Sequence, residues 1–322
     1  MVVDGHADTP TEWLEHPFDV CKPSAHQVDF PKMRAGGLDV ELFAAYVPAK
    51  HADHDAYAFT TTLIDDIHRM VDACPSDAAI ALSTDDIRAI VASGRRAIVV
   101  SIEGGHAIED SLEKLDDFYR RGVRAMTLTH FNTNHWADSA NDAPKHHGLT
   151  PKGESVIREM NRLGMMIDVS HASDETFWDV LGVTKAPIVA THSSVRALCD
   201  KPRNVSDDML RAVAKNHGVV MINFLSMYLA ADAKTATAST IVDHVEHAIE
   251  VAGVDSVGLG SDFGNDVPLA KGMEDATKLP FVADELRRRG HSEEDIHKVM
   301  GENFMRVFAE VERVARDEAA SK

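Results

Sequence analysis

Short apolar runs alternate along this chain with longer segments of helical periodicity. The eight apolar runs are rich in Val, Ile and Leu, and they lie at residues 2–3, 38–47, 97–103, 124–130, 164–171, 187–192, 218–224 and 256–262. Short runs of this composition, bounded by Gly, Pro or polar residues, are typical of buried strands. The pattern therefore predicts eight strands.

The segments between the runs carry helix signals, and they span residues 55–73, 83–92, 109–121, 151–162, 173–182, 206–216 and 239–252. Carboxylates follow Ser83, Ser173 and Ser206. A serine and acidic groups at a first turn satisfy unpaired N–H groups and interact favourably with the helix dipole. Helices are therefore predicted to begin at these three serines.

Strands that alternate with helices pair in parallel through right-handed crossovers. Eight such units predict an α/β fold, a (β/α)8 TIM barrel, in which the chemistry lies at the C-terminal ends of the strands. A doubly wound open sheet is the alternative, but no GxGxxG motif follows the first strand. Residues 265–322 are predicted to add a C-terminal extension with helices near 281–289, 293–300 and 302–318. No linker or repeat interrupts the chain, so residues 1–322 are expected to form a single domain.

Composition mainly excludes classes of partner. The 322 residues are 44% hydrophobic and 26% charged, as in ordinary soluble proteins with a large core. The net charge of −19, without a basic run longer than residues 287–289, argues against nucleic acid or an anionic membrane surface as a partner. No apolar run approaches the roughly 18 residues of a membrane span. The chain opens on a predicted core strand, which leaves no room for a signal peptide, so a cytoplasmic enzyme is expected.

The three cysteines, Cys21, Cys74 and Cys199, are far apart, and no CxxC motif occurs. Neither a disulfide framework nor a thiolate zinc site is indicated by this spacing. We therefore expect all three cysteines to be reduced.

Six of the eight predicted strands stop at a side chain that can bind a metal or transfer a proton. In chain order these residues are His6, Asp8, Glu103, His106, His130, Asp168, His171, His192 and Asp262. The C-terminal ends of the strands of a barrel form one ring, so these side chains are expected to gather in one pocket. Solvent-exposed histidines have no reason to share this position, and the recurrence therefore indicates a site.

This inventory suits two metal ions. His6 and Asp8 lie two residues apart on one face of a strand and can hold one ion. His171 and His192 can hold the other, and the two oxygens of Glu103 can bridge them. Imidazole and carboxylate ligands suit zinc. Paired ions roughly 3.5–4 Å apart acidify a bridging water towards a pKa of about 7.

The other strand-end residues have different expected roles. Asp262 remains as the acceptor for the proton of that water, and His130 as a donor towards a developing oxyanion. Asp168 is expected to hydrogen-bond backbone groups rather than a metal, whereas His106 either orients a ligand or belongs to a plain loop. Solvated positions are expected for the remaining candidates, namely His135, His146 and His147 in a loop and His244 and His247 on a helix face.

Motifs that contain these residues run in order through almost the whole chain. They are Asp4-Gly-His-Ala-Asp8, Ile102-Glu-Gly-Gly-His106, Met126-Thr-Leu-Thr-His130, Asn134-His-Trp-Ala-Asp138, Gly148-Leu-Thr-Pro-Lys-Gly153, Ile167-Asp-Val-Ser-His171, Thr191-His-Ser-Ser194, Pro202-Arg-Asn-Val205, Asn223-Phe224 before Tyr228, Gly260-Ser-Asp-Phe263 and Gly272-Met-Glu-Asp275. Together they resemble the membrane (renal) dipeptidase family, peptidase family M19, within the amidohydrolase superfamily.

The resemblance implies a zinc-dependent dipeptidase on a (β/α)8 barrel. The metal ligands carried over by motif are His6 and Asp8 for one zinc, His171 and His192 for the other, and Glu103 as the bridge. By the same resemblance His130 polarises the scissile carbonyl, Arg203 binds the terminal carboxylate of the substrate, and Tyr228 lines the substrate site. Asp262 handles protons. The implied substrate is a dipeptide whose second residue is D or L.

Two departures from the family pattern affect what the resemblance implies. The family usually continues Gly-Ser-Asp-Phe with Asp-Gly, whereas this chain has Gly264-Asn265, so preference for the substrate's N-terminal residue is left open. Eukaryotic members are secreted, lipid-anchored and disulfide-bonded, and nothing in this sequence supports those features. The chain therefore resembles a bacterial cytosolic member.

Two other functions are kept as alternatives. One is a different amidohydrolase of the phosphotriesterase or deaminase type, but the former usually has a carbamylated lysine at the end of its fourth strand, and residues 124–130 contain none. The other is a non-catalytic binding protein, which would normally have lost a ligand. The sequence does not determine the preferred dipeptide or the oligomeric state, and a homodimer is an open alternative.

Overall fold

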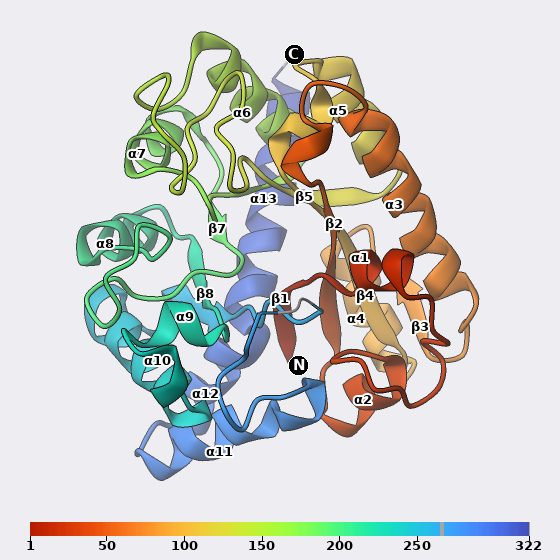
Figure 1. Cartoon of the computed structure of the whole chain (residues 1–322), viewed down its shortest axis with the longest axis vertical. Helices are drawn as coiled ribbons and strands as arrows, with labels where there is room; N and C mark the ends of the chain where they lie inside the picture. The colour runs from red at the N-terminus through yellow and green to blue at the C-terminus, as the bar shows by residue number, and fades with distance from the viewer. Residues whose placement is uncertain (265–266, 322) are drawn as a thin grey trace.

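The computed structural model describes residues 1–264 and 267–321. In this part of the chain, eight parallel strands follow one another in chain order around the sheet: β1 (Val3–Ala7), β2 (Val40–Tyr46), β4 (Arg96–Glu103), β5 (Val123–Thr127), β6 (Met166–Asp168), β7 (Val189–Ala190), β8 (Val219–Ile222) and β9 (Val257–Leu259). A parallel bridge between Ala7 and Phe263 brings the last strand beside the first. The sheet is therefore closed, and the predicted barrel is confirmed (Figure 1).

One strand was not predicted. β3 (Ala78–Ile80) pairs in parallel with the first half of β4, whose second half pairs with β5. With three residues it is too short to give a recognisable apolar run.

The helices found between and after the strands are α1 (Thr9–Glu15), α2 (Phe30–Ala35), α3 (Ala56–Asp72), α4 (Thr84–Ala92), α5 (Leu112–Arg120), α6 (Pro151–Leu163), α7 (Asp174–Val183), α8 (Asp207–Lys215), α9 (Ser226–Leu229), α10 (Ala238–Ala252), α11 (Pro280–Arg288), α12 (Glu293–His297) and α13 (Asn303–Ala320). The three predicted starts are confirmed. Ser83, Ser173 and Ser206 each accept a hydrogen bond from the backbone N–H three residues on. The short helices α1, α2 and α9 were not predicted.

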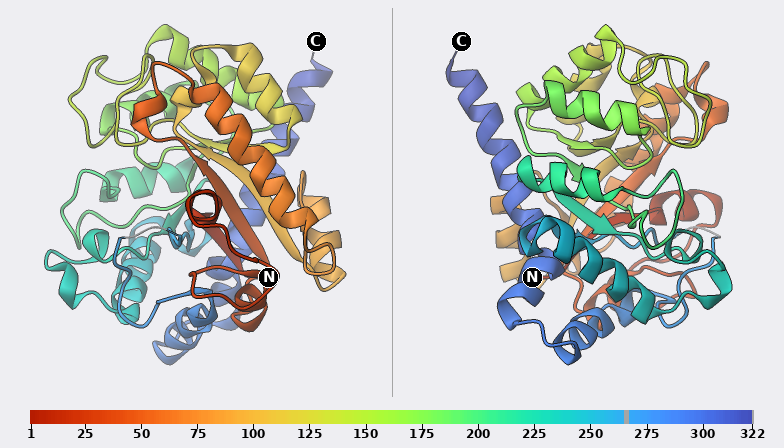
Figure 2. Two further views of the ribbon diagram at one scale, coloured as in Figure 1. Left: turned by 45° about the vertical axis from the view of Figure 1, so that its right-hand side comes forward. Right: turned by 90° about the vertical axis from the view of Figure 1, so that its left-hand side faces the viewer.

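The C-terminal extension covers the amino-terminal side of the barrel. Phe304 and Phe308 of α13 belong to one apolar cluster with Val40, Ala97 and Val219, which lie at the first or second position of their strands. Figure 2 shows α13 as a long straight helix along this side of the molecule. Because this end is filled by apolar packing, the opposite, carboxyl ends of the strands are the ones available for a site.

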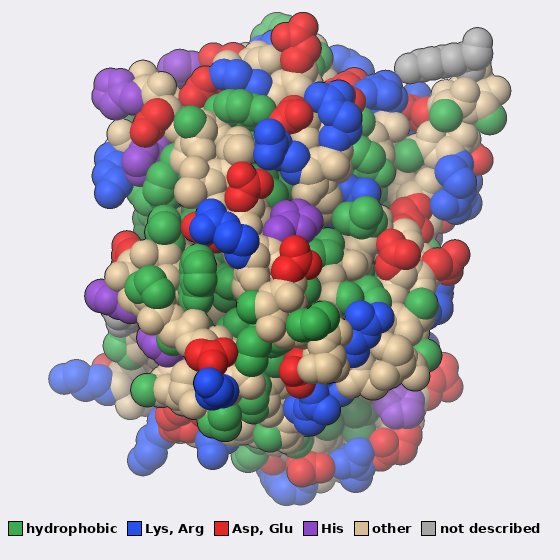
Figure 3. Space-filling view, turned by 90° about the vertical axis from the view of Figure 1, so that its right-hand side faces the viewer, with side chains coloured by type: hydrophobic (Ala, Val, Ile, Leu, Met, Phe, Trp, Pro, Cys, Tyr) green, Lys and Arg blue, Asp and Glu red, His purple; other side chains and the backbone are tan. Residues whose placement is uncertain are grey.

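One face of the molecule shows how charged and apolar side chains are distributed on the surface (Figure 3). On the face drawn in Figure 3, acidic and basic side chains are interspersed with apolar ones. Among the described residues, no helix combines the length and hydropathy needed to cross a bilayer.

The prediction of three reduced cysteines is wrong. Cys21, in the loop after α1, forms a disulfide with Cys74 at the end of α3, and only Cys199 remains as a thiol, which is buried. The two half-cystines are 53 residues apart in sequence. Their pairing depends on how the loop folds back against α3, and no local sequence motif predicts it.

Candidate metal centre and active site

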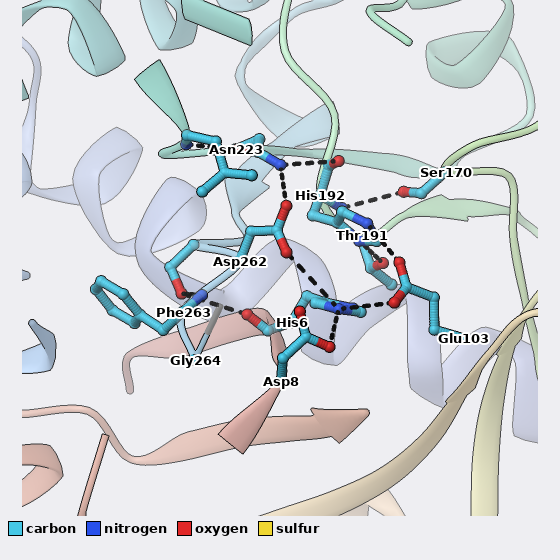
Figure 4. A network of polar contacts seen from close by, with 12 residues as sticks. His6, Asp8, Glu103, Ser170, Thr191, His192, Asn223, Asp262, Phe263 and Gly264 are labelled. Carbon is cyan, nitrogen blue, oxygen red and sulfur yellow. Dashed lines mark hydrogen bonds and ion pairs between the residues drawn. The ribbon is translucent and has the colours of Figure 1, made fainter. Parts of the chain in front are cut away.

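The first part of the site is the end of β1. The pairing of β1 with β2 is irregular between Asp4 and Ala7, and His6, which lies within this irregular stretch, has its side chain in the site. A Cβ at Gly5 would lie 2.4 Å from the carbonyl oxygen of Thr191, so only glycine allows the strand to approach so closely. His6 Nε2 lies 3.5 Å from Asp8 Oδ1, and a dashed line marks this contact in Figure 4.

Glu103, the last residue of β4, lies between two sets of side chains. Its Oε1 is 3.0 Å from Nε2 of His171 and 3.2 Å from Nε2 of His192. Its other oxygen, Oε2, is 3.7 Å from Nε2 of His6. Each carboxylate oxygen thus faces different imidazoles, which is the arrangement expected of a bridging ligand.

Backbone geometry contributes to this convergence. His171 and Asp262 both adopt left-handed conformations, with φ of 65° and 66°. Such conformations cost about 1–3 kcal/mol for residues with a side chain, and they persist where surrounding structure holds them. The turns direct both side chains into the same pocket, although the two residues are far apart in sequence.

The buried donor set fits divalent cations. Within the described chain the ligand atoms form three overlapping groups: His6, Glu103 and His192; Glu103, His130 and His171; His6, Asp8 and Asp262. His6 Nε2 and Asp8 Oδ1 are buried and have no hydrogen-bond partner among the described residues. A buried polar atom without a partner is costly, and a metal ion that accepts its lone pair removes that cost.

The electrostatics of the cluster lead to the same conclusion. Burial raises the pKa of Glu103 and that of Asp262, and the negative charge of the nearby Asp8 raises both further. Burial alone would lower the pKa of His6, but the negative charges of Glu103 and Asp8 outweigh it and raise that pKa to about 10. The cluster therefore requires positive charge, which metal ions can supply in place of a proton.

His130 lies on the same side of the site as His171. Its Nε2 is 3.8 Å from Glu103 Oε1, and the two imidazole centroids are 4.4 Å apart. Burial lowers the pKa of His130 to about 3, so its ring is neutral near pH 7 and presents one N–H donor. Tyr46 packs edge-on against this ring, and burial together with the charge of Glu103 raises the pKa of Tyr46 to about 12.

Arg203 lies behind the clustered ligands. Its Nη1 donates to Ser193 Oγ at 2.7 Å, and its Nη2 donates to the carbonyl oxygen of His192 at 2.8 Å. Its Nε is buried without a hydrogen-bond partner among the described residues. The guanidinium carbon is 5.9 Å from the ring centroid of Tyr228.

A cavity of about 170 Å³ opens onto the cluster. Six of the predicted residues line it, namely Asp8, Glu103, His130, His171, Tyr228 and Asp262, whereas the buried His6, His192 and Arg203 are not among its lining residues. Sequence reasoning missed Tyr46, Phe131 and Met227, which also line it. Tyr46 ends β2, Phe131 lies in the loop after β5 and Met227 lies in α9, and in a single sequence such aromatic or apolar residues are indistinguishable from core residues. Phe131 has 49% of its surface exposed, so it forms part of the cavity mouth.

Some of the candidate residues were expected to have structural or solvated roles rather than a role in the site. Asp168 is confirmed as a hydrogen-bond acceptor, because its Oδ1 accepts from the backbone N–H groups of Ser170 and Thr191. His106 has a structural role in its loop, since its Nε2 lies within hydrogen-bond distance (3.0 Å) of the carbonyl oxygen of Val47. His135 is exposed as expected.

The predicted solvated helix face at His244 is wrong. His244 is fully buried, its Nδ1 accepts from the N–H of Val195, and its Nε2 donates to the carbonyl oxygen of Leu229. It connects α10 to the loop that contains Val195 and to the end of α9. His247 is half-buried and paired with Asp207.

The Gly264-Asn265 departure is described only in part. The N–H of Gly264 donates to Gln27 Oε1 at 2.7 Å, and a Cβ at Gly264 would lie 2.6 Å from the backbone nitrogen of Thr9. Asn265 lies outside the described residues.

Comparison with known proteins gives consistent matches. Residues 1–322 match the profile of membrane dipeptidase (peptidase family M19). The chain is 36% identical over 325 residues to dipeptidase 3 of Rattus norvegicus, covering 97% of this chain and 65% of that protein. It is 37% identical over 307 residues to dipeptidase tcpJ of Claviceps purpurea, covering 92% of this chain and 72% of that one. The chain thus spans less than two thirds of the rat relative.

A solved structure extends this likeness to three dimensions. The crystal structure of a metallopeptidase from Rhodobacter sphaeroides, liganded with a phosphinate mimic of the dipeptide L-Ala-D-Ala, superposes with a TM-score of 0.89 at 25% identity. The superposition covers 96% of this chain and 99% of that one.

Proposed function

Because this chain belongs to the membrane dipeptidase family (peptidase family M19), we propose that it hydrolyses dipeptides with the help of two zinc ions per chain. The observation that carries the proposal is the position of Glu103, whose two oxygens face separate imidazole sets. A single metal site would need only one of these sets.

The donor set determines how the ions would be held. His6 and Asp8 would hold one zinc, His171 and His192 would hold the other, and Glu103 would be shared by the two. Imidazole and carboxylate are ordinary zinc ligands. Bound there, zinc would supply Lewis acidity towards the scissile carbonyl and acidify the attacking water.

Asp262 acts as the proton acceptor. Its Oδ2 accepts a hydrogen bond from Nδ2 of Asn223 at 2.7 Å, which fixes the plane of the carboxylate. Its other oxygen, Oδ1, faces the cluster of metal-ligand candidates and lies 3.9 Å from His6 Nε2. In this position Asp262 takes the proton that the attacking water loses and transfers it to the leaving amine.

His130, Arg203 and Tyr228 position the substrate. The neutral imidazole of His130 donates its N–H to the carbonyl oxygen as that oxygen gains charge. Arg203 binds the C-terminal carboxylate of the dipeptide, for which its buried Nε–H is an available donor. Tyr228 lines the cavity, with its ring centroid 5.9 Å from the guanidinium carbon of Arg203. The L-Ala-D-Ala mimic bound by the Rhodobacter sphaeroides relative supports a substrate range that includes L-Xaa-D-Xaa dipeptides.

The test combines metal analysis with a hydrolysis assay. We expect about two zinc ions per chain and release of free amino acids from L-Ala-L-Ala and L-Ala-D-Ala. A zinc-loaded protein that binds dipeptides without cleaving them would support the non-catalytic alternative. Cleavage of phosphotriesters or deamination in preference to dipeptide hydrolysis would support the other amidohydrolase alternative.

Location and assembly stay predictions. Disulfide bonds such as Cys21–Cys74 are more frequent in proteins of oxidising compartments, which weighs against the expected cytoplasmic location. The homodimer is likewise untested.

A further inference from the structure

We propose that Thr191 and Asp168 are positioning residues that place the ring proton of His192 on Nδ1, so that Nε2 presents its lone pair to the metal. The inference rests on the proposed function, because it concerns how one of the zinc ligands is prepared. It assigns a task to two buried residues, neither of which lies at the metal cluster.

The three side chains form a short chain of hydrogen bonds. Thr191 Oγ1 lies 2.6 Å from Asp168 Oδ2 and 2.9 Å from His192 Nδ1. All three residues are buried, with at most 2% of their surfaces exposed. Figure 4 shows Thr191 beside His192, whose ring points towards Glu103.

Asp168 acts only as an acceptor. Its Oδ1 accepts from the backbone N–H groups of Ser170 and Thr191, both at 2.9 Å. Its Oδ2 receives the hydroxyls of Thr127 at 2.5 Å and Thr191 at 2.6 Å. Four donors around two oxygens is the pattern of an ionised carboxylate, which has no proton to give.

The direction of the remaining hydrogen bond follows by counting protons. The hydroxyl of Thr191 has a single hydrogen, and Asp168 accepts it. Towards His192, Thr191 Oγ1 can therefore only accept. His192 must donate through Nδ1–H, and a neutral imidazole protonated there has its lone pair on Nε2.

This lone pair is directed at the cluster. His192 Nε2 lies 3.2 Å from Glu103 Oε1 and 3.0 Å from His171 Nε2, so the three atoms surround one point. The opposite tautomer would place a proton at that point and would exclude a metal ion. The Thr191 hydroxyl thus selects the ring form that can ligate.

His171 lacks an equivalent arrangement. Its Nδ1 is buried and has no hydrogen-bond partner among the described residues. The two imidazoles of this half of the site therefore differ, and His192 is the one whose proton is placed by the protein before metal binds. Hydrogen bonds of this kind behind a metal-binding histidine typically contribute 10- to 100-fold to metal affinity.

The chain offers a matched control. Thr127 donates to the same oxygen of Asp168 as Thr191 does, but it lies on β5, whereas Thr191 is the neighbour of His192 in sequence. Thr127→Val and Thr191→Val each remove one hydroxyl from Asp168, and both keep the side-chain shape. Thr191→Val also retains the backbone N–H that binds Asp168 Oδ1, so the carboxylate stays in place.

The experiment measures zinc affinity of the full chain by competition with a chromophoric chelator. We expect Thr191→Val to weaken binding of one zinc on the order of 10- to 100-fold, Thr127→Val to weaken it much less, and Thr191→Ser to restore it. A long-range ¹H–¹⁵N spectrum of the metal-free protein should show His192 protonated on Nδ1, and Thr191→Val should lose this preference.

Two results would overturn the inference, namely equal zinc affinities in Thr191→Val and Thr127→Val, or an Nε2–H tautomer of His192 in the metal-free wild type. Thermal melting of each variant separates a general loss of structure from a specific effect. If the wild type binds no zinc, the proposed function itself fails. If it binds zinc and cleaves dipeptides while the two valine variants agree, only the tautomer assignment fails.

Discussion

The amide of Asn223 donates to Asp262 at 2.7 Å, and this bond leaves the second oxygen of the carboxylate facing the ligand cluster. Asp262→Asn keeps the size of the side chain but removes its ability to accept a proton. We expect kcat to fall by on the order of 10²-fold or more, with zinc content unchanged. Zinc content and kcat are measured on the same sample. The side chains of Asp262, His6 and Asp8 are close enough to hold one metal ion together. Loss of zinc from this variant would therefore show that Asp262 is a metal ligand and would contradict its assigned role as proton acceptor.

Glu103→Gln tests the bridge. A neutral amide has one oxygen and cannot serve two cations, so zinc occupancy and turnover are expected to fall together. Glu41→Gln is a matched control, because Glu41 is a buried glutamate on the neighbouring strand whose pKa burial raises well above its usual range. The control should keep its zinc and its rate. Full occupancy with a near-normal rate in Glu103→Gln would rule out the bridge.

The buried His106 makes stability depend on pH. Burial lowers its pKa from 6.5 to about 4, so the unfolded chain binds the proton more readily than the folded one. The stabilisation is fully present above pH 6.5 and is lost as the pH falls towards 4, with a total on the order of 3 kcal/mol. His106→Gln keeps a donor for Val47 but does not titrate. Denaturant unfolding of both proteins between pH 4 and 7 should show a smaller pH dependence for the variant, and parallel curves would contradict the assignment.

The Cys21–Cys74 disulfide predicts the thiol count and part of the stability. Denatured, unreduced protein should react as one thiol, that of Cys199, and reduced protein as three. Closing a loop of 53 residues restricts the unfolded chain, so Cys21→Ser with Cys74→Ser should lower the unfolding free energy by roughly 4 kcal/mol. Cys199→Ala is the control, since it removes a thiol without opening the loop. Three reactive thiols in the unreduced protein would show that the bond does not form.

The parts of the site that could be predicted depend on topology alone. Parallel strands in a barrel end on one ring, so His6, Glu103 and Asp262 were expected together although nearly the whole chain separates the first from the last. Pattern is enough here because each residue follows directly on a recognisable strand.

The parts that could not be predicted depend on tertiary distances. His244 occupies a helical position like that of a solvated residue, and only the packed structure shows that it accepts from Val195. The pairing of Cys21 with Cys74 is likewise visible only in the packed structure. So is the role of the Thr191 hydroxyl, which follows from its distances to Asp168 and His192. A single sequence contains no measure of such distances.

The last prediction concerns the length of the substrate. Arg203 is buried and donates a hydrogen bond to the backbone carbonyl of His192, so the proposed carboxylate anchor is held at a fixed distance from this metal-ligand candidate. We expect a single residue to fit between the scissile carbonyl and this anchor, so that a tripeptide would place its carboxylate one residue too far. The guanidinium would then stay buried without its anion, which costs on the order of several kcal/mol.

Free dipeptides should therefore be cleaved at least about 10²-fold faster, by kcat/KM, than tripeptides or dipeptide amides, since 1.4 kcal/mol corresponds to about tenfold. Arg203→Ala should remove this preference by lowering the rate on free dipeptides. Arg196→Ala is the matched control, because Arg196 lies on the same segment but pairs with Asp174 outside the cavity. It should leave the preference intact. Equal cleavage of dipeptides, their amides and tripeptides by the wild type would show that Arg203 does not anchor a carboxylate and that the enzyme does not measure substrate length in this way.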